Sequence, residues 1–158
     1  MKLSTASKII LSIIFCLLIG FISGFSTSSS ISTWYVDLNK PFFNPPNWIF
    51  APVWTTLYIL MGVSFGWIWS SSDESSNKKK ALSFFGIQLA LNALWSLLFF
   101  GLKNPELALL NLIFLLFFIV VTIKEFSSIN RKASWLLYPY LAWVSFATIL
   151  NTAIVILN

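Results

Sequence analysis

The chain has 158 residues, of which 58% are hydrophobic and only 9% are charged, and its mean hydropathy is +0.84. Soluble domains carry about 25% charged residues, so this composition excludes an ordinary soluble domain. Intrinsic disorder is excluded as well, because disordered chains combine low hydrophobicity with high net charge. The composition therefore predicts a protein that resides in a lipid bilayer.

Five long segments contain no charged residue, and each is close to the roughly 20 residues that a membrane-spanning helix needs. We expect these helices at residues 9–25, 52–69, 81–102, 107–123 and 135–157. The first segment also resembles a secretory signal, but its apolar part is longer than that of a typical signal, and we expect a retained helix. The sequence thus predicts an all-α membrane protein in which residues 1–158 form one domain, a bundle of five transmembrane helices.

The ten basic residues are distributed unevenly between the two ends of such a bundle. Eight lie at the end that holds the N-terminus and the loops at residues 70–80 and 124–134, whereas Lys40 and Lys103 lie at the other end. Basic residues collect on the cytoplasmic side of membrane proteins, so we expect the N-terminus inside and the C-terminus outside. A plasma membrane is the favoured location. Because topology accounts for the positive charge, we expect no nucleic-acid partner.

Glycine and proline add local detail to the predicted helices. Gly20 with Gly24, and Gly62 with Gly66, are small residues four positions apart. Such pairs let two helix backbones approach closely. They indicate either packing within the bundle, which we favour, or a contact between two copies of the chain. Pro139 falls inside the fifth predicted helix and should kink it, because proline lacks the backbone donor.

Polar residues follow one face of the third and fifth predicted helices. Gln88, Asn92 and Ser96 recur every four residues along the third helix. Trp95 lies beside them, and the fifth helix carries Tyr140, Trp143, Ala147 and Asn151 at three- and four-residue spacing. These faces either hydrogen-bond helix to helix, at about 0.6 kcal/mol per bond, or enclose an uncharged pocket of indole, phenol and amide groups.

None of the five segments contains an Asp, Glu, Lys or Arg away from its ends. Proton-coupled carriers need intramembrane carboxylates or histidines, and cation channels usually need acidic rings or carbonyl filters, so ion-driven transport is not expected. The sequence has no histidine and a single cysteine, Cys16, so we expect no metal site and no internal disulfide.

The segment at residues 34–51, between the first two predicted helices, is rich in proline and tryptophan. Prolines keep a backbone extended, and tryptophans favour the headgroup level of a membrane. An ordinary aromatic belt is one interpretation, but we favour a structured lid over the mouth of the bundle, where ligands often bind. The predicted lid residues are Trp34, Tyr35, Lys40, Pro41, Pro45, Pro46 and Trp48.

These motifs resemble those of a known protein family. The pattern W-Y-x-x-L-x-K-P-x-x-x-P-P-x-W at residues 34–48, followed by P-V-W-x-x-L-Y at residues 52–58, is similar to that of the TspO/MBR family. This family comprises the translocator proteins, also called peripheral benzodiazepine receptors. Blocks at residues 88–101 and 139–151 agree with it too, and the chain resembles a bacterial member.

The resemblance implies a five-helix bundle, often a homodimer, with a cavity beneath the first loop. Family members bind tetrapyrroles of the protoporphyrin class, so we expect a ligand of this kind, surrounding lipid and no obligatory cofactor. Carried over by position, the expected cavity residues are Trp54, Asn92, Trp95, Trp143, Ala147 and Leu150. A flat macrocycle stacks well on indole faces, and the small Ala147 leaves room for its plane.

The chain also departs from the animal members of the family. Their proposed cholesterol motif has a Tyr and an Arg after a Leu, whereas here Leu150 is followed by Thr152 and Ile156, so cholesterol recognition does not carry over. Leu107 replaces a tryptophan that lines the ligand site, and Asn111 replaces a common aspartate. Without histidine, a haem iron would find no imidazole ligand.

Four functions are compatible with these features. The leading one is a receptor-like protein that binds tetrapyrroles and related hydrophobic ligands, in porphyrin handling or stress regulation. The second is an enzyme that degrades porphyrin in light, as reported for some bacterial relatives. We assign it no catalytic residue, because no acid–base or metal constellation accompanies the tryptophans. The third is a carrier of porphyrins or other lipophiles, which the lack of internal repeats disfavours. The fourth is a scaffold with a vestigial cavity.

Overall fold

The computed structural model describes residues 3–72 and 76–158, which form helices and no strand. The helices are α1 (Thr5–Ile31), α2 (Trp34–Asp37), α3 (Asn47–Ser70), α4 (Ser76–Ser96), the π-helix η1 (Leu97–Gly101), α5 (Pro105–Ile129), α6 (Arg131–Trp135) and α7 (Tyr138–Leu157). Five helical segments are long and apolar enough to cross a membrane, with α4 joined to η1 and α6 joined to α7. The prediction of an all-α bundle of five transmembrane helices is therefore confirmed.

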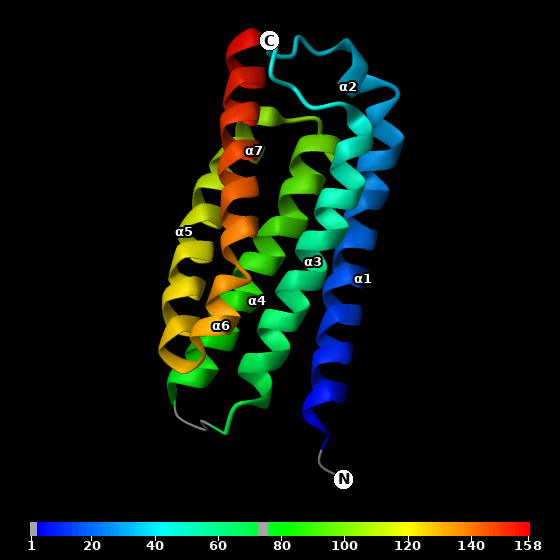
Figure 1. Cartoon of the computed structure of the whole chain (residues 1–158). Helices are drawn as coiled ribbons and strands as arrows, with labels where there is room; N and C mark the ends of the chain where they lie inside the picture. The colour runs from blue at the N-terminus through cyan, green and yellow to red at the C-terminus, as the bar shows by residue number, and fades with distance from the viewer. Residues whose placement is uncertain (1–2, 73–75) are drawn as a thin grey trace.

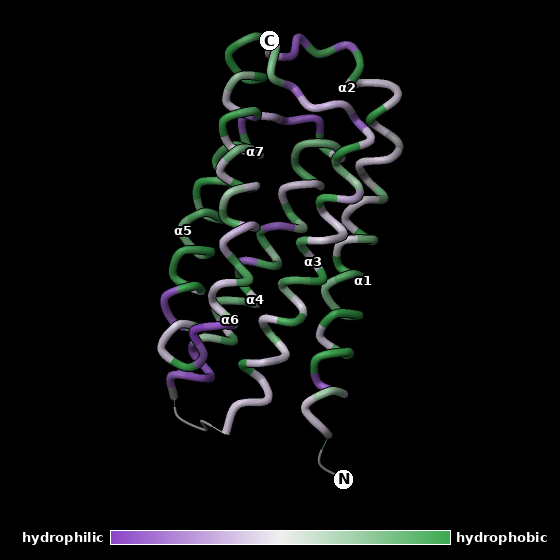
Figure 2. The backbone as a smooth tube through the Cα atoms, viewed as in Figure 1, coloured by the Kyte–Doolittle hydropathy of each residue, from purple (hydrophilic) through white to green (hydrophobic). Residues whose placement is uncertain are grey.

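The long helices lie side by side, and the two termini are at opposite ends of the bundle (Figure 1). The short helix α2 and the loop after it lie at the same end as the C-terminus. Hydrophobic residues dominate the long helices, whereas hydrophilic residues gather mainly at the two ends (Figure 2). This pattern is expected of a bundle whose sides face lipid and whose ends face water.

Helix α3 begins at Asn47, five residues before the start that we predicted at residue 52. Pro46 occupies the N-cap position, and Pro52 lies inside the helix, where its missing donor leaves the carbonyl of Trp48 without the usual helical partner. The segment at residues 34–51 is consequently not a continuous extended loop. It begins with the single turn of α2 and ends within the first turns of α3.

The fifth predicted helix is broken rather than kinked at Pro139. Helix α6 ends at Trp135, two residues form a turn, and α7 starts at Tyr138, with Pro139 in its first turn, where a missing donor costs little. In the turn, the amide of Leu137 donates to the carbonyl of Ser134. The carbonyl of Ala133 instead accepts a 2.7 Å hydrogen bond from the buried hydroxyl of Ser64 on α3. A side chain from α3 thus supplies the donor for this carbonyl at the break.

Glycines bring α1 and α3 into close contact. A Cβ atom on Gly62 would lie 2.5 Å from the Cα of Ile13, and one on Gly66 would lie 2.6 Å from the Cα of Ile9. A Cβ atom on Gly20 would overlap the ring of Tyr58. The interpretation of these three glycines as packing residues within the bundle is confirmed. Gly24 differs, because a Cβ atom there would meet nothing within 4 Å.

Replacing Gly62 with valine is expected to destabilise the bundle by about 1–3 kcal/mol, because the added side chain meets backbone that cannot move aside cheaply. Thermal unfolding in detergent, followed by circular dichroism, measures this loss. Gly86→Val is the matched control, since a Cβ atom at Gly86 has no neighbour within 4 Å. Equal losses of stability in the two variants would contradict the packing role of Gly62.

Candidate functional site: an aromatic cavity

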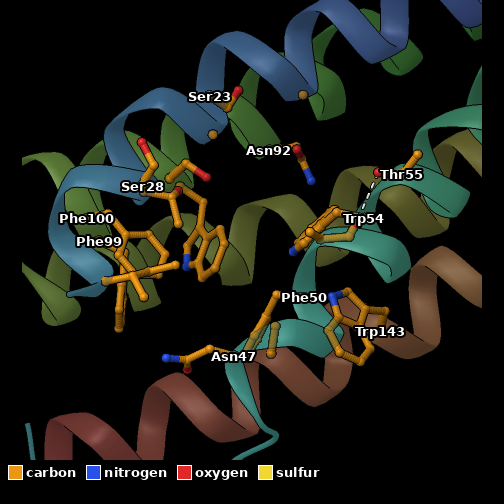
Figure 3. Close-up of a pocket in the computed structure, with 18 of the residues that line it drawn as sticks. Ser23, Ser28, Asn47, Phe50, Trp54, Thr55, Asn92, Phe99, Phe100 and Trp143 are labelled. Carbon is orange, nitrogen blue, oxygen red and sulfur yellow. Dashed lines mark hydrogen bonds between the residues drawn. The ribbon is translucent and has the colours of Figure 1, made fainter. Parts of the chain in front are cut away.

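A cavity of about 540 Å³ lies in the half of the bundle that carries α2. Its described lining residues come from α1, α2, α3, α4, η1 and α7 (Figure 3). Sites for small molecules typically have volumes of about 300–1,000 Å³ and mostly apolar walls. The size and lining of this cavity are thus those of a binding site for a small organic molecule.

The structure brings all six residues predicted for the cavity to its walls. These residues are Trp54, Asn92, Trp95, Trp143, Ala147 and Leu150. Of the seven predicted lid residues, Tyr35 also lines the cavity, while the other six are outside its described lining. Trp34 packs edge-on against Phe99, and Trp48 is 74% exposed. Among the predicted lid residues, Tyr35 alone belongs to the described lining of the cavity.

Aromatic rings form two walls of the cavity. On one side, the ring centroids of Trp54 and Trp95 are 6.2 Å apart with planes tilted by 31°, and those of Trp95 and Phe99 are 5.7 Å apart with a tilt of 32°. On the other side, the Trp143 ring lies 5.5 Å from that of Phe146 and 6.0 Å from that of Phe50. Such surfaces are suited to a flat apolar molecule.

A hydrogen-bond network crosses the bundle at Asn92. The hydroxyl of Tyr58 donates to the Asn92 Oδ1 at 2.5 Å, and the Asn92 Nδ2 donates to the hydroxyl of Tyr140 at 3.1 Å. All three residues are buried. An asparagine amide has two N–H donors and two lone pairs, so one donor and one lone pair of Asn92 are not used by the two tyrosines.

The other buried amides have different roles. The Trp95 Nε1 donates to the Asn151 Oδ1 at 3.3 Å, and the Asn151 Nδ2 donates to the carbonyl of Pro105 at 2.8 Å. Asn111 donates to the carbonyl of Leu91 and holds α5 to α4. Gln88 is 1% exposed, and neither polar atom of its side chain has a partner among the described residues. Both interpretations of the polar stripes therefore apply, since Asn92 and Asn151 link helices and also line the cavity.

The loop after α2 is held to the end of α7. The backbone amide of Asn39 donates to the Asn158 Oδ1 at 2.9 Å, and the Asn158 Nδ2 donates to the carbonyl of Asn39 at 3.0 Å. The hydroxyl of Tyr35 donates to the Asn44 Oδ1 at 2.8 Å. Burial raises the pKa of the Tyr35 phenol, and the hydrogen bond to Asn44 lowers it by a smaller amount, so the phenol remains a donor at neutral pH.

Sequence reasoning missed two groups of lining residues. Phe99 and Phe100 belong to η1, whose amide at Leu102 donates to the carbonyl of Leu97 in the wider π pattern. π-helical turns are frequent at functional sites but have no clear signal in a single sequence. Residues of α1, such as Gly20, Gly24 and Ser28, also line the cavity. Because these three small residues are spaced four apart, the sequence could have predicted that they share one face of α1.

The chemistry that this cavity supports is apolar binding. None of its described lining residues carries a formal charge, and its hydrogen-bonding groups are hydroxyls, amides and indole N–H groups. Stacking and exclusion of water stabilise a flat ligand in such a site, while a few polar atoms orient it.

The bundle and its cavity define an integral, multi-pass membrane protein with an aromatic cavity in one half of the bundle. The sequence model of the TspO/MBR family matches residues 12–157, and the chain belongs to this family. The chain is 46% identical over 151 residues to the tryptophan-rich protein TspO of Archaeoglobus fulgidus, covering 96% of this chain and 97% of that protein.

Two further relatives have names that describe different roles. The tryptophan-rich sensory protein of Cereibacter sphaeroides is 38% identical over 125 residues, covering 79% of this chain and 77% of the relative. The translocator protein of Bos taurus is 38% identical over 133 residues, covering 84% of this chain and 79% of the relative.

Proposed function

We propose that this protein is a receptor-like membrane protein that binds tetrapyrroles of the protoporphyrin class, and related flat hydrophobic molecules, in porphyrin handling or stress regulation. The observation that carries this proposal is the uncharged cavity of about 540 Å³ with Trp54, Trp95 and Trp143 in its walls. The sensory role in the name of the Cereibacter sphaeroides relative supports the regulatory part.

The proposed binding mode follows from the shape of the site. Each aromatic contact contributes about 0.5–1.5 kcal/mol beyond the burial of apolar area, so several indole faces together hold a macrocycle firmly. The spare donor and lone pair of Asn92 meet a polar edge of the ligand. Ala147, which lies on α7 among the aromatic residues, leaves space for the plane of the ring.

Titration of the detergent-solubilised protein with protoporphyrin in the dark tests this function. We expect tryptophan fluorescence to fall along a saturable curve with one ligand per chain, and Trp143→Phe to reduce the amplitude of quenching. Linear, unsaturable quenching would overturn the proposal. Illumination of the same samples adds a second result, because loss of porphyrin absorption that requires Trp143 would instead support a degrading enzyme.

We also propose that the N-terminus lies inside the cell, in a bacterial plasma membrane, with the cavity near the outer face. Support comes from the eight basic residues at the N-terminal end of the bundle. A membrane-impermeant maleimide should label Lys103→Cys in intact cells, and Lys132→Cys only after the membrane is opened. Cys16 is fully buried and adds little background. The reverse labelling pattern would show the opposite orientation.

A further inference from the structure

We propose that ligands enter the cavity sideways from the lipid bilayer, through a window between α1 and α3, and not from the water beneath the loop after α2. The ligand class rests on the proposed function, whereas the window rests on the structure alone. Its chemistry fits an amphiphile that is already dissolved in the membrane, with a flat apolar body and a polar edge.

The exposure of the lining residues locates the window. The described lining residues that are exposed are Phe21, Ser28, Asn47, Ala51 and Thr55. All of them belong to α1 or α3, whereas the described lining residues of α2, α4, η1 and α7 are buried or half-buried. Figure 3 shows Ser28 on α1 and Thr55 on α3 at the margin of the cavity. The cavity is therefore open along the boundary between these two helices.

The spacing of α1 and α3 explains why the opening is there. At the N-terminal end of α1 the two backbones are close, because Gly66 faces Ile9 and Gly62 faces Ile13. Further along α1, at Gly20, the ring of Tyr58 on α3 fills the space between the two helices. One turn later, at Gly24, there is no atom within 4 Å of the position of a Cβ. The helix contact thus ends between Gly20 and Gly24, and the cavity begins to open sideways there.

The window faces the membrane rather than water. Phe21 is 72% exposed and Phe25 is 76% exposed, and both lie within the membrane-spanning part of α1, Thr5–Phe25. Beyond this part the edge of the window becomes polar, with Ser28 on α1 and Asn47 on α3. The opening therefore crosses from the hydrocarbon layer to the headgroup layer. A bound amphiphile would place its apolar body beside Trp54 and a second polar group, apart from the one at Asn92, near Ser28 and Asn47.

The aqueous end of the cavity is covered by the loop. Tyr35 is 4% exposed and is held by its hydrogen bond to Asn44. The reciprocal hydrogen bonds between Asn39 and Asn158 fix the loop to the end of α7, and the ring of Phe43 packs edge-on against Phe146. Entry from water would require these contacts to break, while entry from lipid requires no comparable rearrangement.

The rate of dark protoporphyrin binding to the protein in liposomes tests the route. Gly24→Phe places a ring in the window, starting from a Cβ position with no atom within 4 Å, and should slow association by about tenfold or more. Gly86→Phe is the matched control, because its site is equally open but lies on α4 away from the cavity, and its rate should stay close to that of the parent.

A disulfide between Asn39→Cys and Asn158→Cys tests the loop. The reciprocal hydrogen bonds between Asn39 and Asn158 hold these two residues next to each other, so oxidation of the cysteine pair would lock the loop to α7. With the loop locked, the association rate should equal that of the same sample after reduction. Slower binding in the locked protein, together with an unchanged rate in Gly24→Phe, would overturn the lateral route.

A labelling experiment separates the window from the identity of the ligand. In Ala147→Cys, a lipophilic maleimide added to the liposomes should react much faster than a charged thiosulfonate confined to water, and Gly24→Phe should slow that reaction. The parent, with its buried Cys16, gives the background. Equal reaction with the charged reagent and no effect of Gly24→Phe would overturn the window. The expected labelling without porphyrin binding would instead retain the window and reject the proposed ligand.

Discussion

Ala147→Phe is expected to weaken protoporphyrin binding by about a hundredfold, equivalent to a loss of roughly 2.7 kcal/mol of binding free energy. Ala147 lies on α7 in the same cavity as Trp95 and Trp143, so a phenyl ring there occupies the space proposed for the macrocycle. The folded protein itself should lose little stability, because the new ring enters an open cavity instead of a filled core. Dark titration by tryptophan quenching measures the change.

The matched control for this prediction is Ala142→Phe. Ala142 is on the same helix and is exposed on the outside of the bundle, outside the described lining of the cavity. Its affinity for protoporphyrin should be that of the parent, and thermal unfolding of both variants should show intact bundles. If the two variants bind equally well, the ligand does not occupy the space beside Ala147.

Asn92→Leu is expected to lower the free energy of unfolding by about 3 kcal/mol. Leucine has a similar size, but it leaves the hydroxyl of Tyr58 without its acceptor and the hydroxyl of Tyr140 without its donor. Each buried polar group that loses its partner costs about 1–3 kcal/mol, and water cannot easily replace the amide in the middle of the bundle. Chemical or thermal unfolding in detergent provides the measurement.

The double variant Asn92→Leu with Tyr58→Phe tests the cause of that loss. Removing the orphaned hydroxyl should restore part of the stability, by about 1 kcal/mol, so the two substitutions are not additive. Tyr58→Phe alone should destabilise the parent, because it removes a buried hydrogen bond. Additive losses in the double variant would show that Asn92 acts through its volume and not through its hydrogen bonds.

The transmembrane helices could be predicted from the sequence because lipid imposes a simple rule. Each segment must satisfy its own backbone hydrogen bonds and present apolar side chains over about 20 residues, and this requirement is visible in hydropathy alone. The six cavity residues followed from the motifs, and the spacing of Asn92 and Trp95 on one helix, and of Trp143 and Ala147 on another, supports their convergence.

Features that depend on contacts between helices could not be predicted in the same way. The break before α7 uses a hydroxyl from α3, and hydropathy does not reveal that Ser64 reaches the carbonyl of Ala133. The early start of α3 depends on how Pro46 caps the helix, and one sequence permits Pro52 either at its start or inside it. The apolar residues of α1 could not be assigned to lipid or cavity, because both environments favour the same side chains.

The π-helix η1 has a consequence for how α4 tolerates changes in chain length. The amide of Leu102 donates to the carbonyl of Leu97, five residues back, so this turn holds one residue more than an α-helical turn. Deleting a single residue within η1 would let the backbone return to α-helical bonding without breaking the helix. The same deletion between Gln88 and Trp95 would rotate the polar stripe by about 100° relative to the rest of the bundle and separate Asn92 from its two tyrosines. One end of α4 therefore accommodates a change of length that its middle does not.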